Sequence, residues 1–134
     1  MFCLETTFLI DLLKGKKDAI DVYIKIRDSK LYTTSISAWE LLRGPKLVGK
    51  EEEFKVAVEM LENLEILPFS FKSAQIAVEI EDSLRKKGME INLIDVLIAA
   101  IAIEHNLKLV TRDEHFSRID GLEAINYSSE QNSG

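Results

Sequence analysis

The chain has 134 residues, a formal net charge of −6 and a hydrophobic content of 46%. This size and composition predict one domain with its own core and exclude a disordered polyelectrolyte. One cysteine cannot form an internal disulfide, and the N-terminus lacks the basic start of a secretion signal, so we expect a cytoplasmic protein. The apolar stretch 93–103 is too short to cross a bilayer, so we expect no membrane association. Taken alone, the excess of acidic over basic residues argues against nucleic-acid binding.

Strand and helix patterns alternate along the first half of the chain. Residues 2–5 are a short apolar strand, after which Thr6 and Thr7 suit the N-cap of a helix reaching about residue 14. The spacing of apolar residues predicts a second helix over 18–28. A short strand, a helix opened by a serine and weakening at a Gly-Pro pair, and a further amphipathic helix follow, over residues 31–34, 37–45 and 51–63.

The second half continues the alternation. Strands are predicted over 65–69, 107–111 and 123–127, and helices over 73–87 and 93–105, the last almost wholly apolar. Strands separated by helices need crossover connections, so the fold class is α/β, with a central, mainly parallel sheet of four to five strands flanked by helices. We assign residues 1–127 to the domain and 128–134 to a short polar tail.

Four acidic residues stand near the ends of predicted strands. Glu5 ends the first strand, and Glu40 lies one turn into the helix after the second. Asp95 begins the apolar helix, and Asp113 follows the fourth strand. Because the carboxyl ends of parallel strands share one edge of the sheet, we expect these side chains to meet there.

Converging carboxylates raise one another's pKa unless a cation neutralises them. A set of oxygen ligands without Cys or His selects Mg²⁺ or Mn²⁺, which suit phosphodiester hydrolysis. The acidic balance would then build a cation site through which an anionic substrate is held.

Each acid also has an explanation in helix capping. Ser37 and Glu40 have the spacing of a capping box, and Asn92 and Asp95 nearly repeat it. Residues 111–113 could be an ordinary polar turn. Capping accounts for each acid separately, whereas it does not account for their shared place at the strand ends.

Four segments together resemble the motifs of the PIN domain family. Residues 4–15 (LETTFLIDLLKG) resemble its opening motif, and residues 34–44 (TSISAWELLRG) are similar to the second. Residues 94–102 (IDVLIAAIA) and 109–116 (LVTRDEHF) resemble the third and fourth. Each motif is short, but the four occur in order and cover about residues 2–127, so the resemblance implies the three-layer fold of that family.

Short single-domain members of this kind resemble the VapC toxins of prokaryotic toxin–antitoxin pairs. The resemblance implies an endoribonuclease that depends on Mg²⁺ or Mn²⁺ and leaves a 5′-phosphate and a 3′-hydroxyl. It also implies a homodimer neutralised by a cognate antitoxin whose C-terminal segment wraps the toxin. The catalytic acids would be Glu5, Glu40, Asp95 and Asp113, with Glu5, Asp95 and Asp113 as metal ligands and Thr111 and Thr7 as supporting hydroxyls.

Glu5 departs from the family, in which the first acid is ordinarily Asp. Mg²⁺ tolerates little error in ligand geometry, so we expect an activity that survives but is reduced. Thr7 stands where Asn or Ser is usual and keeps a hydroxyl. One alternative is a PIN-fold binding module that has lost catalysis, and another is a PIN nuclease of RNA processing. A phosphoacceptor domain ranks last, because no Lys directly follows a strand at the proper place.

The remaining candidates stay open between a functional and a structural role. Asp11, inside the first helix, is expected to be an exposed acid. Arg43 and Arg112 adjoin motif acids and could either contact RNA phosphates or pair with carboxylates. His115 lies close to Asp113 and is expected mainly to be a surface residue.

Basic and aromatic side chains are candidates for contacts with partners. A basic rim that guides RNA could be formed by Lys14, Lys16, Lys17, Lys46 and Lys50. The region in which the resemblance places an antitoxin groove contains Trp39, Phe54 and Leu61.

Overall fold

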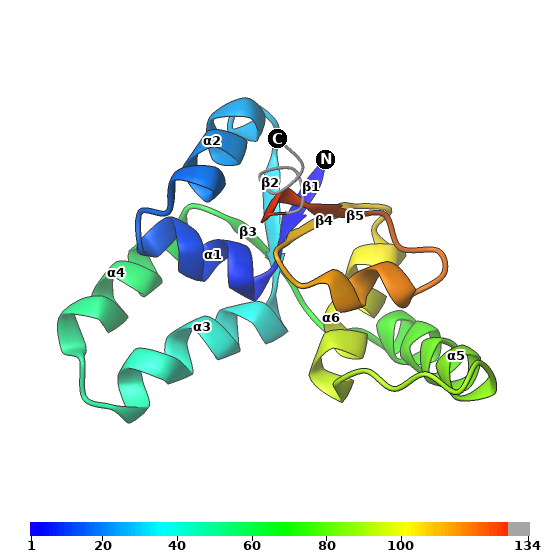
Figure 1. Cartoon of the computed structure of the whole chain (residues 1–134). Coiled ribbons are helices and arrows are strands. Elements are labelled where there is room, and N and C mark those ends of the chain that lie inside the picture. Colours follow the sequence, from blue (N-terminus) through cyan, green and yellow to red (C-terminus); the bar gives the residue numbers. More distant parts are fainter. Residues whose placement is uncertain (129–134) are drawn as a thin grey trace.

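The computed structural model describes residues 1–128 and contains a parallel five-stranded sheet with helices on both faces (Figure 1). The strands are β1 (Phe2–Leu4), β2 (Leu31–Thr34), β3 (Glu65–Leu67), β4 (Lys108–Thr111) and β5 (Ala124–Asn126). Their order across the sheet is β3-β2-β1-β4-β5. This arrangement confirms the predicted α/β class. Of the polar tail predicted over 128–134, residues 129–134 lie outside the described part of the chain.

The helices lie in two groups, one on each face of the sheet. They are α1 (Thr6–Leu13), α2 (Lys17–Ile26), α3 (Ser35–Leu47), α4 (Glu51–Glu62), α5 (Phe71–Lys86) and α6 (Leu93–Glu104), with a short 3₁₀ helix, η1 (Glu114–Arg118). Figure 1 shows α1 to α4 on one side of the sheet and α5 and α6 on the other. None of these described helices combines the length and apolar character needed to cross a bilayer.

Alternation along the strands divides the core between the two faces. Cys3 pairs with Leu109, and both pack against the α5 and α6 side. The next pair, Leu4 and Val110, packs against α1, α3 and α4 on the opposite side. Successive side chains of a strand point to opposite faces, so one register supplies both cores.

The apolar character of α6 follows from its central position. Five successive side chains, residues 98–102, are fully buried. Asn92 caps the helix, since its side chain accepts a hydrogen bond from the backbone N–H of Ile94 at 2.8 Å. Asp95 therefore sits in the first turn of a helix that the core holds in place.

The start of α3 corrects the predicted capping box. Thr34, the last residue of β2, has an extended backbone, and its hydroxyl accepts from the N–H of Ser37 at 2.9 Å. The helix therefore begins two residues earlier than predicted, and Ser37 lies inside it rather than capping it. Because the cap is Thr34, Glu40 is not a partner in a capping box and remains available for another contact.

Other element boundaries also differ from the predictions. The helix α3 does not weaken at its Gly-Pro pair; it continues through Pro45 to Leu47, before Gly49 adopts a left-handed φ of 75°. Glu5, not Thr6 or Thr7, occupies the N-cap position of α1. Ser70 caps α5 through reciprocal bonds with Ser73, so this helix also begins earlier than predicted.

Candidate active site at the carboxyl ends of the strands

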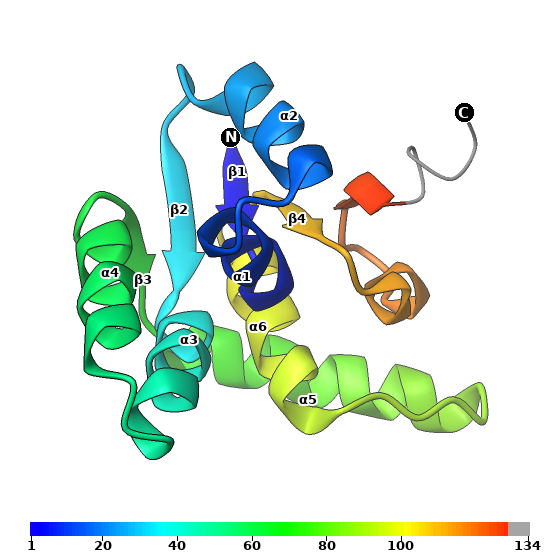
Figure 2. The same ribbon diagram turned by 60° about the vertical axis from the view of Figure 1, so that its left-hand side comes forward.

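The register of β1 and β4 brings Glu5 beside Thr111. Strands β1 and β4 are neighbours in the sheet (Figure 2), and Leu4 pairs with Val110. Glu5, which follows β1, and Thr111, the last residue of β4, therefore lie at the same edge of the sheet. Glu5 is 2% exposed, and its Oε1 accepts hydrogen bonds from the hydroxyls of Thr111 and Thr7, both at 2.6 Å. One carboxylate oxygen thus joins β1, α1 and β4.

Backbone donors hold these two hydroxyls in turn. The N–H of Arg112 donates to Thr7 Oγ1 at 2.9 Å, and the N–H of Asp113 donates to Thr111 Oγ1 at 3.0 Å. Each threonine therefore accepts from the segment after β4 and donates to Glu5. Both hydroxyls that were predicted to support the site are therefore held in a fixed orientation toward Glu5.

Glu40 lies on α3 and contacts α1. Its Oε1 accepts from the hydroxyl of Thr6 at 2.6 Å. Thr6 is 6% exposed and was not predicted as a site residue. Its position between Glu5 and Thr7 in the first motif was the only sequence signal, and nothing in that motif indicates the pairing with α3.

Asp113 is the N-cap of η1 and contacts His115. Its Oδ1 accepts from the backbone N–H of His115 at 2.9 Å and lies 3.0 Å from the imidazole Nδ1. Thr111 is the last residue of β4 and Arg112 lies in a bend, so the polar turn suggested for residues 111–113 is confined to residues 112–113. The same turn also brings a histidine to the edge of the acidic group.

The pKa of Asp95 responds to the negative charges of the other three acids. Burial, followed by the charges of Glu5, Asp113 and Glu40, raises the pKa of Asp95 to about 7, and His115 opposes this shift. Burial also raises the pKa of Glu5, against the hydrogen bonds from Thr111 and Thr7. Acids from four separate segments thus influence one another electrostatically at one edge of the sheet.

The donor set fits a hard divalent cation that keeps part of its water shell. Within residues 1–128, no three His, Cys, Asp or Glu side chains are gathered closely enough to enclose an ion as they stand. The nearby ligands are carboxylate and hydroxyl oxygens, and their charges destabilise one another in a way that a cation would relieve. Mg²⁺ and Mn²⁺ accept such oxygen ligands, and Mg²⁺ usually retains several waters.

Asp11 is buried, which overturns the expectation of an exposed helical acid. It is 4% exposed, and its Oδ2 accepts from the Tyr127 hydroxyl at 2.5 Å and lies 2.9 Å from Arg112 Nε. Arg112 therefore pairs with a carboxylate, but with Asp11 rather than the adjacent motif acid. Tyr127 was missed, because a tyrosine after a C-terminal strand carries no sequence signal that links it to the first helix.

Arg43 lies over the ring of Trp39 at 5.0 Å, on the exposed side of α3. Trp39 is half exposed, whereas Leu61 is buried in the core.

A groove of about 460 Å³ runs between α1, α3 and α4 and includes Glu40 in its wall. Its other lining residues are Ile10, Leu13, Lys14, Leu41, Gly44, Pro45, Glu52, Glu53 and Val56.

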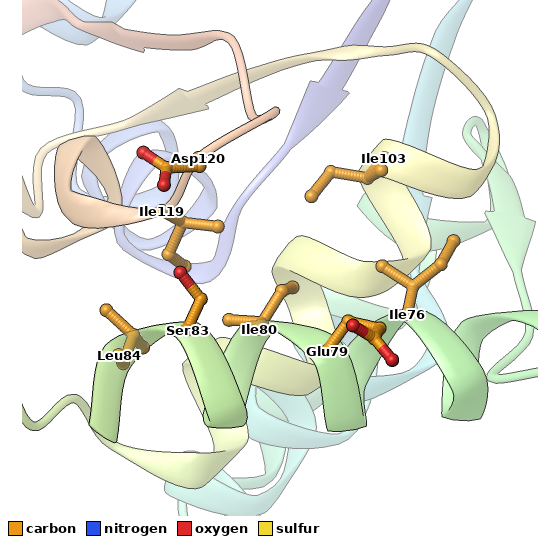
Figure 3. Close-up of a pocket in the computed structure, with 8 residues that line it drawn as sticks. All are labelled: Ile76, Glu79, Ile80, Ser83, Leu84, Ile103, Ile119 and Asp120. Carbon is orange, nitrogen blue, oxygen red and sulfur yellow. The ribbon is translucent and has the colours of Figure 1, made fainter. Parts of the chain in front are cut away.

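A separate pocket of about 270 Å³ lies on the opposite side of the sheet. Ile76 and Ile80 on α5, Ile103 on α6 and Ile119 border the same space (Figure 3). None of the predicted site residues lines it. Its lining is mostly apolar, with Glu79, Ser83 and Asp120 also bordering it.

The whole chain is similar to known proteins of one family. The sequence pattern of the PIN domain matches residues 2–122. Ribonuclease VapC1 of Rickettsia felis is 30% identical over 131 residues, which cover 94% of this chain and 96% of that protein. The tRNA(fMet)-specific endonuclease VapC of Salmonella typhimurium is 28% identical over 123 residues, covering 90% and 93%.

A solved structure shares the fold at a similar identity. VapBC2 from Rickettsia felis, bound to a DNA fragment from its promoter, superposes with a TM-score of 0.83 and 28% identity, over 92% of this chain and 96% of that chain. The chain belongs to the PIN domain family. Within the family it is similar to the VapC ribonucleases, as its four motifs predicted.

Proposed function

We propose that the chain is an endoribonuclease that depends on Mg²⁺ or Mn²⁺ and acts as the toxin of a VapBC-type pair. The observation that carries the proposal is the carboxylate edge itself: Glu5, held by two hydroxyls, adjoins Asp95, Glu40 and Asp113. The ribonuclease names of the relatives support RNA as the substrate. Such an enzyme would meet RNA in the cytoplasm.

Glu5 and Asp95 would hold the ion, with Asp113 as a further ligand, directly or through water. When bound, the ion would lower the pKa of a water molecule and stabilise charge on the phosphate oxygens. Thr111 and Thr7 orient the Glu5 carboxylate by donating to Oε1. Thr6 orients Glu40 in the same manner.

The residues present support hydrolysis rather than a covalent enzyme intermediate. Water adds to phosphorus while the bond from phosphorus to the 3′ oxygen breaks, which leaves a 5′-phosphate and a 3′-hydroxyl. In the metal-free protein the Asp95 carboxyl can hold a proton near neutral pH, because burial and neighbouring acids raise its pKa to about 7, and the carboxyl would lose this proton when the ion binds.

Arg43 would contact an RNA phosphate. It lies on the helix that carries Glu40, and it is held over the exposed face of Trp39. Replacing Arg43 with Gln should weaken RNA binding. The slope of log KM against log salt concentration should also fall by about the amount that one phosphate contact contributes. Arg85→Gln, at the end of α5, is the matched control. Arg112, bound to Asp11, would reach a phosphate only with its outer guanidinium edge.

The partner would be a cognate antitoxin bound to a homodimer of this chain. The structural relative is a VapBC complex, which supports an antitoxin partner here. A small neighbouring gene whose product has a DNA-binding N-terminus would favour the toxin over a nuclease of RNA processing. Inhibition of cleavage by that product, and the mass of the complex in solution, test this part of the proposal.

The direct test is cleavage of a defined panel of single-stranded and structured RNAs with Mn²⁺. Wild type should cut at discrete positions and leave 5′-phosphates, and Asp95→Asn should not cut. Asp82→Asn is the matched control, because Asp82 is an exposed carboxylate paired with Lys86 on α5. Equal activity of wild type and Asp95→Asn would overturn the proposed nuclease. Metal binding without any cleavage would favour the binding-module alternative.

A further inference from the structure

Asp11, Arg112 and Tyr127 form a polar group in which Asp11 and Tyr127 are buried and the Arg112 side chain is half exposed. They come from α1, the segment after β4 and the residue after β5. Asp11 Oδ2 is the common acceptor, contacted by the Tyr127 hydroxyl at 2.5 Å and by Arg112 Nε at 2.9 Å. Asp11 and Tyr127 are 4% and 1% exposed. Neither Asp11 nor Tyr127 has a role in the hydrolysis described above, and Arg112 enters it only as a phosphate contact.

Arg112 is attached to α1 at two successive turns. Its backbone N–H donates to Thr7, and its side chain binds Asp11, four residues further along the same helix. Residues four apart lie on one face of a helix, about one turn from each other. A two-point attachment of this kind fixes both the rotation and the axial position of α1 against the segment after β4.

That position decides whether Glu5 keeps both of its donors. Thr7 comes from α1 and Thr111 from the end of β4, yet both hydroxyls reach the same oxygen of Glu5. A shift of α1 along the sheet would separate these donors, because a hydrogen bond weakens within a few tenths of an ångström. The ring of Tyr127 packs edge-on against Phe8 at 5.1 Å and keeps α1 in place from the other side.

An ion pair with one half-exposed partner, such as Arg112 with Asp11, adds little stability, because water screens the exposed guanidinium. Its side chains nevertheless specify one geometry. The phenol of Tyr127 stays a donor, since burial and the neighbouring Asp11 both raise its pKa. The group is therefore suited to fixing position rather than to catalysis.

We propose that Asp11, Arg112 and Tyr127 are positioning residues that hold the hydroxyls of Thr7 and Thr111 on Glu5. As a consequence for the metal site, which rests on the proposed function, they preserve the affinity of Glu5 for a divalent cation. The variants are Tyr127→Phe, which removes one hydroxyl, and Asp11→Asn, which removes the charge but keeps an acceptor.

The first measurement needs neither metal nor RNA. Hydrogen exchange should be faster at the amides of Arg112 and Asp113 in both variants, because these amides donate to Thr7 and Thr111. The control is Glu104→Gln, which weakens the acceptor of the Ser70 and Ser73 hydroxyls at the far end of α6. Unchanged exchange at Arg112 and Asp113, or an equal increase in the control, would overturn the proposal.

The second measurement is Mn²⁺ binding by calorimetry at a temperature at which every variant is folded. Tyr127→Phe should weaken binding by about tenfold, as is typical when a residue that supports a metal ligand is lost. In a background that already carries both Thr7→Val and Thr111→Val, the same change should have much less effect, because both hydroxyls through which it reaches Glu5 are gone. Full additivity of Tyr127→Phe with this double change would overturn the positioning role.

The two proposals fail in different ways. If wild type binds no Mn²⁺ and cuts no RNA, the proposed nuclease falls, whereas the exchange of the two amides still decides the positioning role. If wild type is active and Tyr127→Phe matches it in exchange and in affinity, the positioning role falls and the nuclease stands.

Discussion

Thr111 donates its hydroxyl proton to Glu5 Oε1 at 2.6 Å, although the two residues are 106 positions apart in the chain. Glu5 directly follows β1 and Thr111 is the last residue of the neighbouring strand β4, so the sheet register alone brings them together. Burial raises the pKa of Glu5, and this hydroxyl opposes the increase. The contact therefore favours the anionic form of a buried carboxyl.

Replacing Thr111 with Val should weaken Mn²⁺ binding by about tenfold or more, because a hydrogen bond to a charged group contributes about 1.5–3 kcal/mol. Calorimetric titration of the two proteins measures the change. Thr33→Val is the control, since Thr33 is buried and its hydroxyl donates to a backbone carbonyl, that of Leu4, at 2.6 Å. Equal Mn²⁺ affinities of wild type and Thr111→Val would contradict the prediction.

Glu5→Asp should lower Mn²⁺ affinity and cleavage rather than restore a stronger family site. The side chain would lose one methylene, about one carbon–carbon bond in reach, and could no longer approach both Thr7 and Thr111 from the same backbone position. Glu5→Gln, which keeps the length and loses the charge, should bind still more weakly. Tighter Mn²⁺ binding by Glu5→Asp than by wild type would show that the longer side chain is a defect.

The metal-free protein should become less stable as the pH rises from about 4 to about 7. The folded pKa of Asp95 is about 7, above its ordinary value of 3.8, so the folded state binds more protons than the unfolded state in this range. The raised pKa of Glu5 acts in the same direction.

Asp95→Asn should therefore raise Tm at pH 8 and change it little near pH 4. Thermal unfolding at a series of pH values measures this difference. Mn²⁺ should stabilise wild type more at pH 8 than at pH 6, because protons compete with the ion, and the variant should gain less. A Tm of wild type that increases steadily between pH 4 and pH 7 would contradict the assignment of Asp95.

Thr34→Ala should destabilise the fold by about 1 kcal/mol, the usual cost of losing an N-cap side chain. Ser37→Ala should leave stability unchanged or raise it, because the buried Ser37 hydroxyl has no hydrogen-bond partner within the described residues. Urea unfolding of both variants measures the difference. The reverse order would support the capping box that the sequence suggested at Ser37.

The sequence by itself determined the class of fold and the identity of the acidic group. Alternating strand and helix patterns require a parallel sheet, because crossover helices leave few other arrangements. Four acids near strand ends then share one edge whatever the exact boundaries are. The errors at Ser37 and Ser73 were local, since several hydroxyl residues near each helix start could act as its cap.

Only the tertiary structure decided which donor serves each acid. Thr6 bonds to Glu40, and Tyr127 bonds to Asp11, through contacts between segments that are far apart in sequence. Such pairings depend on the register of strands and on the rotation of α1, which periodicity does not specify. Asp11 illustrates the difference, because a helical acid is exposed or buried according to what packs on its face.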